Sequence, residues 1–192
     1  MCIRDSYVVS ALVILVHELS HALTCKHFGR EVRRGGFMLY MGFPVWFVDT
    51  TDIWLSPRTA RILVSWAGPY SGLVLAGLCS LVVFTVPTRL IGGLLFQAAF
   101  SAYVLSLFNL NPLLKFDGYY ILMDWLEIPR LRERAIEFVR EKLWPKLRAH
   151  EPFSGEDRIF AIFGGLSLAW TAFAIGWAVV VWGEQLWQYI RP

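Results

Sequence analysis

Five consecutive residues near the start of the chain, His17-Glu18-Leu19-Ser20-His21, have the types and spacing of a metal site. On a helix, residues four apart lie about one turn from each other on the same face, so both imidazoles could reach one ion. Zinc bound by two histidines needs N–Zn distances of about 2.0–2.1 Å, which this spacing permits. Glu18 points about 100° around the helix from His17, where it could take a proton from a water molecule that the zinc activates. We therefore predict one Zn2+ ion, with Glu18 as the catalytic base.

A zinc ion held by two histidines needs a third protein ligand and an open position for water. Cys25 continues the helical stripe, but it lies eight residues beyond the first histidine, a rise of about 12 Å, so one ion could not bind both. His27 and His150 fall in loops, and we interpret them as solvated. Asp117 is the best-placed acidic residue, because it directly follows a long apolar run and emerges on the same side of a membrane as the second histidine.

The elements that must position these residues are long apolar segments. Residues 62–88, 90–114 and 159–183 contain no Asp, Glu, Lys or Arg, and residues 7–25 contain only Glu18. Each segment meets or approaches the roughly 20 residues that a helix needs to cross a membrane. Buried helices of a soluble protein are the alternative, but a globule of 192 residues could not bury four of them. His and Glu inside an apolar span are costly and are usually functional.

The composition agrees with a membrane protein. Hydrophobic residues make up 56% of the chain and charged residues 17%, whereas soluble domains average about 25% charged residues. The low charge argues against a nucleic-acid partner. The three cysteines are scattered, which argues against a disulfide framework.

The distribution of basic residues predicts the topology. Four spans leave two long loops, 26–61 and 115–158, on one face of the membrane, and these loops hold 15 of the 18 Lys and Arg residues. The positive-inside rule places both loops in the cytoplasm. We predict a multi-pass protein of a bacterial inner membrane, with its active site toward the cytoplasm and the lipid bilayer as a partner.

The two loops differ in character. Residues 31–55 are rich in aromatic and β-branched residues and predict a short hairpin or small sheet at the membrane surface. Residues 127–148 predict an interfacial amphipathic helix, and the alternative is a solvated connector. The predicted helix has a basic face opposite an apolar face made of Leu131, Ala135, Phe138, Val139 and Trp144. The predicted fold is therefore an all-α polytopic membrane protein with about four transmembrane helices, a small β-hairpin after the first and an amphipathic helix before the last.

This reading divides the chain into four parts. The opening MCIRDS is polar and abrupt, and we expect it to be a foreign or truncated leader. The expected parts are 1–6 leader, 7–120 core with the zinc site, three transmembrane helices and the surface β segment, 121–157 cytoplasmic or interfacial amphipathic segment, and 158–192 fourth transmembrane helix and tail.

Two motifs together resemble the site-2 protease family of intramembrane zinc metalloproteases. That family pairs HExxH on one span with Asn-x-x-Pro-x-x-x-x-Asp-Gly on another, and here the second motif is Asn109, Pro112, Asp117 and Gly118. The resemblance implies that Asp117 is the third zinc ligand and that Glu18 is the catalytic base. It also implies that Asn109 helps to hold the substrate or the developing oxyanion.

The chain departs from the family at an intervening element. Gly-Pro-x-x-Asn is frequent there, whereas this chain has Gly68-Pro69-Tyr70-Ser71-Gly72, so we expect both glycines to serve close helix packing. The run 43–49 is similar to that of bacterial peptide zinc metalloproteases, some of which are associated with peptide maturation or export.

The predicted function is an intramembrane zinc endopeptidase that acts on membrane-embedded or membrane-associated peptides or proteins. A helical substrate hides its carbonyls in its own hydrogen bonds and must unwind before attack. The strand-like segment 37–49 could receive the unwound peptide by edge pairing. We predict Phe47, Val48 and Pro112 as substrate-binding residues, and peptide-export or regulatory proteins as further partners.

Two other functions remain open. The chain could be a non-catalytic metal-binding membrane protein that assists peptide maturation or export, although the intact Glu18 argues against a degenerate enzyme. It could also be a cation transporter in which intramembrane His and Glu form the path, although no inverted repeat is visible in the sequence.

Overall fold

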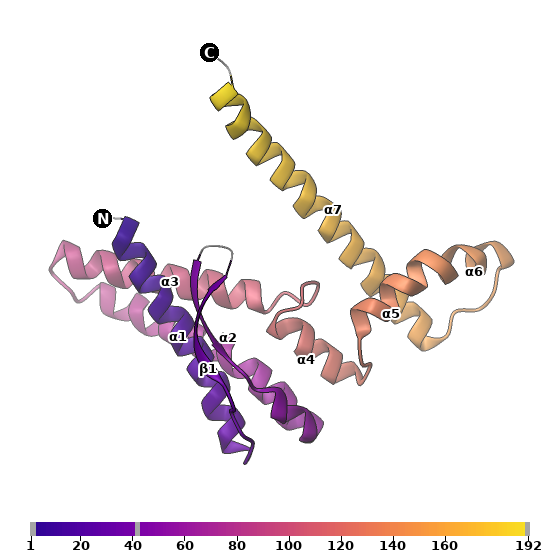
Figure 1. The fold of residues 1–192 in the computed structure, drawn as a ribbon, viewed down its shortest axis with the longest axis horizontal. Helices are drawn as coiled ribbons and strands as arrows, with labels where there is room; N and C mark the ends of the chain where they lie inside the picture. Colours follow the sequence, from indigo (N-terminus) through magenta and orange to yellow (C-terminus); the bar gives the residue numbers. More distant parts are fainter. Residues whose placement is uncertain (1–2, 41–42, 191–192) are drawn as a thin grey trace. The chain divides into compact units, whose positions relative to one another are not determined.

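The computed structural model describes residues 3–40 and 43–190, in two compact units that meet between Glu127 and Ile128. The elements of the first unit are α1 (Ile3–His27), β1 (Gly35–Tyr40), β2 (Phe43–Val48), η1 (Thr51–Leu55), α2 (Arg58–Val83), α3 (Arg89–Asn109) and α4 (Asp117–Leu126) (Figure 1). Those of the second are α5 (Leu131–Glu137), η2 (Phe138–Lys142), α6 (Leu143–Ala149) and α7 (Gly155–Ile190). Of the predicted leader 1–6, residues 1 and 2 lie outside the described residues, and residues 3–6 belong to α1.

Four helices are long and apolar enough to cross a membrane. These segments are Tyr7–His27, Arg58–Val83, Arg89–Asn109 and Gly155–Val181. The predicted fold class, a largely helical chain with four such helices and a small sheet after the first, is confirmed.

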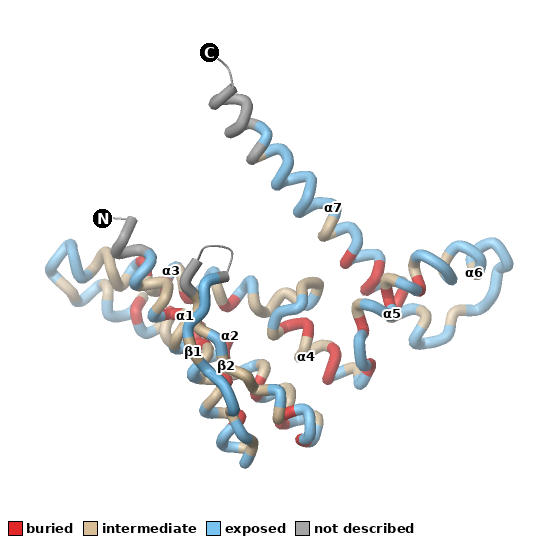
Figure 2. The backbone as a smooth tube through the Cα atoms, viewed as in Figure 1, coloured by how far each residue is buried: buried red, intermediate tan, exposed pale blue. Residues whose placement is uncertain are grey.

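The membrane helices of the first unit pack around α2, which contacts both α1 and α3. Val13, Ala76 and Ala102, one from each helix, form a buried cluster, and Figure 2 shows such buried positions in the middle of the helices. Gly72 permits the close approach of α2 to α3, because an added Cβ would overlap Oγ of Ser106. The expectation that Gly72 serves close helix packing is confirmed.

The predicted hairpin is present as an antiparallel pair of strands. Phe37 lies opposite Trp46, and their rings contact edge to face with centroids 5.4 Å apart. Just beyond the strands, the amide of Asp49 donates to the carbonyl of Arg34 at 2.8 Å. Arg34 and Asp49 thus form a hydrogen-bonded pair, and such pairs alternate along an antiparallel ladder with pairs that are not hydrogen-bonded to each other. Val48 and Trp46 belong to the second kind, so their backbone amides and carbonyls point away from β1. They form the outer edge of β2.

Within the third apolar run, the helix ends at Asn109, six residues before the next charged residue, Lys115. The chain then turns: the side chain of Asn111 accepts a hydrogen bond of 2.9 Å from the amide of Leu113, and α4 begins at Asp117. Gly118 lies so close to the backbone of Leu110 that a Cβ could not fit between them. This contact fixes the start of α4 against the end of α3.

In the second unit, the segment predicted as one amphipathic helix forms α5, η2 and α6. Its apolar face is covered by protein, since the ring of Phe138 lies 6.1 Å from that of Phe160 in α7, and an added Cβ on Gly164 would lie 2.6 Å from the carbonyl oxygen of Ala135. Trp144, which the sequence groups with this face, is exposed instead. The placement of this segment at a membrane interface stays a prediction.

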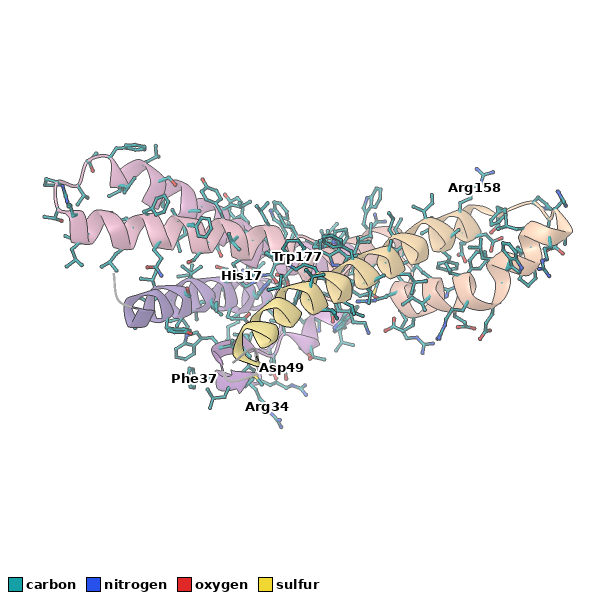
Figure 3. The ribbon with its side chains drawn as sticks, turned by 90° about the horizontal axis from the view of Figure 1, so that it is seen from above. His17, Arg34, Phe37, Asp49, Arg158 and Trp177 are labelled. Atoms are coloured by element: carbon teal, nitrogen blue, oxygen red, sulfur yellow. The ribbon has the colours of Figure 1, made fainter. Side chains whose placement is uncertain are left out.

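The start and the later part of α7 differ in their surroundings. Its first turns face α5 and η2, whereas residues 172–180 are all exposed, as Figure 2 shows. Arg158 marks the first part and Trp177 the second (Figure 3). None of the described residues of the second unit covers that apolar stretch, which is the pattern of a helix that faces lipid.

Candidate metal centre

Three side chains that lie far apart in the sequence meet at one point of the first unit. Nε2 of His17 lies 3.2 Å from Nε2 of His21, and Oδ2 of Asp117 lies 3.1 Å from the first and 3.4 Å from the second. Both histidines are buried, with 4% and 8% of their surface exposed. His17 lies among the helices of this unit, as Figure 3 shows. The structure thus brings together the two histidines of HExxH and the aspartate that the sequence favours.

The spacing of these three atoms fits a single zinc ion. Ligands bound tetrahedrally at about 2.0–2.1 Å are separated by roughly 3.3 Å, and the three observed separations lie within 0.2 Å of this value. Two imidazole nitrogens and one carboxylate oxygen are a ligand set of catalytic zinc sites, which keep a fourth position open. Within the described residues, this His-His-Asp cluster could therefore hold a metal ion.

A backbone carbonyl in α2 orients one of the histidines. Nδ1 of His21 donates to the carbonyl oxygen of Val64 at 2.7 Å, which leaves Nε2, the nitrogen directed at His17 and Asp117, as the one that would bind a metal. Nδ1 of His17 is buried and has no hydrogen-bond partner among the residues that the structure describes.

Gly68 provides the space in which the two imidazoles lie. An added Cβ would overlap Nε2 of His21 and would lie 2.6 Å from Nε2 of His17. The sequence predicts this glycine as a packing residue between helices, and the structure shows that it packs against the two imidazoles of the candidate metal centre. A side chain of any size would overlap them.

Asp117 is the first residue of α4 and is partly buried. Burial raises the pKa of its carboxyl, but the hydrogen bonds and charges of His17 and His21 outweigh burial, so the pKa lies below its ordinary value. The carboxylate is therefore ionised at neutral pH, as a metal ligand must be.

A cavity of about 370 Å3 opens beside the three ligands. Glu18 and Asn109, the two predicted catalytic residues, both line it. The carboxylate of Glu18 accepts a hydrogen bond from the backbone amide of Val48, and the side-chain amide of Asn109 donates to the carbonyl of Leu105 at 3.0 Å. The side chains of Glu18 and Asn109 are therefore each held by a backbone group nearby. The cavity that they line is large enough for a short peptide segment.

The predicted substrate-binding residues differ in their position. Val48 lines the cavity, and so does Asp49, which follows β2 and is labelled in Figure 3. Phe47 and Pro112 are not among the lining residues of the described chain. Cys25, which the sequence excludes as a ligand, is buried against Ile53.

The far wall of the cavity contains polar and aromatic groups that sequence reasoning missed. Nε of Arg61 donates to Oδ1 of Asp124 at 2.7 Å, and the Arg61 guanidinium lies 6.0 Å from the ring of Trp54. Tyr120 contacts Trp54 edge to face, with centroids 6.1 Å apart. Burial raises the pKa of Asp124, and the hydrogen bond from Arg61 opposes that shift. The helical periodicity of residues 117–126 could have placed Asp124 on the same side as Asp117, two turns later. It could not have identified Arg61 as the partner of Asp124.

Comparison with known proteins finds two similar chains from Bacillus subtilis (strain 168). One, named "Putative peptide zinc metalloprotease protein YydH", is 29% identical over 119 residues, which are 60% of this chain and 45% of YydH. The other, named "Putative zinc metalloprotease YwhC", is 28% identical over 211 aligned positions that cover 83% of this chain and 92% of YwhC. The match thus spans less than half of YydH and nearly all of YwhC. No protein-family model matches the chain, and no solved structure matches it significantly.

Proposed function

We propose that the chain is an intramembrane zinc endopeptidase of the site-2 protease type. The observation that carries this proposal is the meeting of His17, His21 and Asp117 beside a cavity that Glu18 lines, with their ligand atoms as far apart as the ligands of one zinc ion would be. The names of the two relatives support the zinc metalloprotease class. The four apolar helices are consistent with an integral membrane protein.

The ligand residues would hold the ion with one position open toward the cavity. A bound zinc ion supplies Lewis acidity, which polarises a carbonyl group and lowers the pKa of water. Val64 keeps the His21 ring in the tautomer that can bind, and Gly68 leaves the necessary space. Both histidines are buried, so solvent screens the charges of the centre less than it would screen charges at the surface.

Glu18 is the proton carrier of the proposed reaction. It follows His17 directly, lines the cavity and is not one of the three clustered ligands, so its carboxylate is free to accept a proton from the attacking water. It would then return the proton to the leaving amine. Asn109, on the same cavity wall, could donate to the oxygen that becomes negative when water attacks.

The outer edge of β2 is the proposed place for the substrate backbone. Trp46 directs its backbone amide and carbonyl away from β1, and β2 leads to the cavity at Val48 and Asp49, where the amide of Val48 donates to Glu18. A peptide that unwinds from a membrane helix needs partners for its exposed backbone groups, and a strand edge supplies them. Membrane peptides or membrane proteins are therefore the proposed substrate class.

We also propose the orientation that the basic residues favour. The two loops that hold most Lys and Arg are those that contain the hairpin and the start of α4. By the positive-inside rule, the metal centre would face the cytoplasm of a bacterial inner membrane. Partners in peptide export or regulation belong to the same proposal.

Zinc content and cleavage measured on the same protein test this function. We expect the purified chain in lipid vesicles to bind one zinc ion and to cleave a reporter joined to a transmembrane peptide. Chelation should stop cleavage and added zinc should restore it, whereas Asp117→Asn should lower zinc occupancy. Full occupancy in Asp117→Asn contradicts the ligand set. Cation flux across the vesicles without cleavage would favour a transporter, and zinc binding without cleavage a non-catalytic protein.

A further inference from the structure

A series of polar contacts links the ends of helices around the metal centre. Arg61 in α2 lies in the middle: its Nε donates to Oδ1 of Asp124 at 2.7 Å, and its Nη1 donates to the carbonyl of Ser56 at 3.2 Å. Oγ of Ser56 accepts a hydrogen bond of 2.6 Å from Nε of Arg30, which follows α1. We call these four residues the clasp.

The clasp joins the same three helices that build the metal centre. Helix α1 carries both histidines, α2 contributes the carbonyl of Val64 and the space at Gly68, and α4 begins with Asp117. Asp124 lies seven residues after Asp117, which is about two helical turns, so the two carboxylates lie on the same side of α4. That side faces α2, because Asp124 reaches Arg61 there.

A second ion pair, between α2 and the residue that directly follows α4, provides a natural comparison. Nη1 of Arg58 lies 3.0 Å from Oε1 of Glu127, whose side chain is 65% exposed, whereas the side chain of Asp124 is 4% exposed. Solvent screens an exposed pair, which contributes little. Removing one partner of a buried pair leaves an uncompensated charge in the protein and disturbs it strongly. The two pairs thus differ in burial but join the same helices.

Helix α4 has ten residues and depends on its contacts for a fixed position. Gly118 holds its start against Leu110, and the Arg61–Asp124 pair holds its second turn against α2. We propose that Arg61 and Asp124 are positioning residues, which keep the carboxylate of Asp117 within reach of the ion that the two histidines hold. This inference rests on the proposed zinc function.

Zinc affinity measured without substrate tests the proposal. We expect Asp124→Asn to raise the zinc Kd about tenfold, the low end of the range for groups that orient metal ligands. The matched control Glu127→Gln should change the Kd by less than about twofold. Cobalt bound in place of zinc should show a changed visible spectrum in Asp124→Asn and an unchanged spectrum in Glu127→Gln, because only the first disturbs the ligand geometry.

The outcomes separate this inference from the proposed function. Equal zinc Kd values and cobalt spectra for wild type, Asp124→Asn and Glu127→Gln would overturn the positioning role, even where Asp124→Asn lowers cleavage through a substrate contact. If Asp117→Asn loses zinc while Asp124→Asn keeps the wild-type zinc Kd, the positioning role is wrong but the proposed zinc function stands. If Asp124→Asn does not fold, Arg61→Lys is measured instead, because it keeps the charge but replaces the two separate donors, Nε toward Asp124 and Nη1 toward Ser56, by a single nitrogen. An unchanged Kd in Arg61→Lys then overturns the proposal.

Discussion

Gly68 lies directly beside Nε2 of His21, and no Cβ could be added without overlapping that atom. A residue in the middle of a membrane helix therefore limits the shape of the metal centre. Helix α2 has two roles here, since Val64 orients the His21 ring one turn before Gly68 makes room for it.

Gly68→Ala is predicted to lower zinc occupancy strongly, because the new methyl group and the imidazoles cannot share one volume. Gly77→Ala in the same helix is the control, because a Cβ there meets nothing within 4 Å. Replacing glycine by alanine inside a helix stabilises the folded state by about 0.5–1 kcal/mol, so Gly77→Ala should be at least as stable as wild type. Zinc content of both purified variants checks the prediction, which fails if they bind zinc equally.

Gly72→Ala is predicted to destabilise the contact between α2 and α3 by about 1–3 kcal/mol, as overpacking of a close contact does. The group in the way is Oγ of Ser106, so Ser106→Ala in the same chain should restore most of the loss. The coupling between the two sites is measured from the free energies of unfolding, in detergent micelles, of four proteins: wild type, Gly72→Ala, Ser106→Ala and the double variant. Additive effects would contradict the contact.

The turn after β2 predicts a local pH dependence outside the membrane helices. Hydrogen bonds from the side chain and amide of Thr51 lower the pKa of Asp49 below its ordinary value of 3.8. A carboxyl with a lowered pKa in the folded state stabilises that state above its ordinary pKa, and the contribution is lost as pH falls through the folded value. Thr51→Val should raise the Asp49 pKa toward 3.8 in a carboxyl NMR titration. An unchanged midpoint would show that the Thr51 hydroxyl does not stabilise this carboxylate.

The outer edge of β2 predicts a position-specific effect of proline. Trp46→Pro removes an amide that points away from β1, so it should weaken substrate cleavage without removing a bond of the hairpin. Trp46→Ala controls for the lost side chain and should cleave better than Trp46→Pro. Zinc content should match wild type in both variants. Equal cleavage by the proline and alanine variants would argue against edge pairing.

The sequence predicts the elements better than their contacts. Uncharged runs locate the membrane helices, because charge is costly in a bilayer, although α3 stops at Asn109 where the chain turns before Pro112. The residue types and helical spacing of His17 and His21 predict a shared ion, and the motif containing Asp117 predicts the third group. These positions agree with the cluster that the structure shows.

Other features could not be predicted, because they depend on which surfaces meet. The carbonyl of Val64 has no signal in the sequence, since every residue has such a group. The apolar stripe of residues 131–138 indicates a covered face but not the covering partner, which is α7. Likewise, Arg61 and Asp124 are 63 positions apart and become a pair only through the packing of α2 and α4.

Glu18→Gln in vesicle-reconstituted protein tests the central claim most directly, with zinc content and cleavage measured on the same sample. Glutamine keeps the size of the side chain but cannot accept the proton, and it leaves all three clustered ligands in place. We predict one zinc ion per chain, as in wild type, and a loss of cleavage of at least about 100-fold, as expected when a general base is removed. Unchanged cleavage by Glu18→Gln would contradict the account.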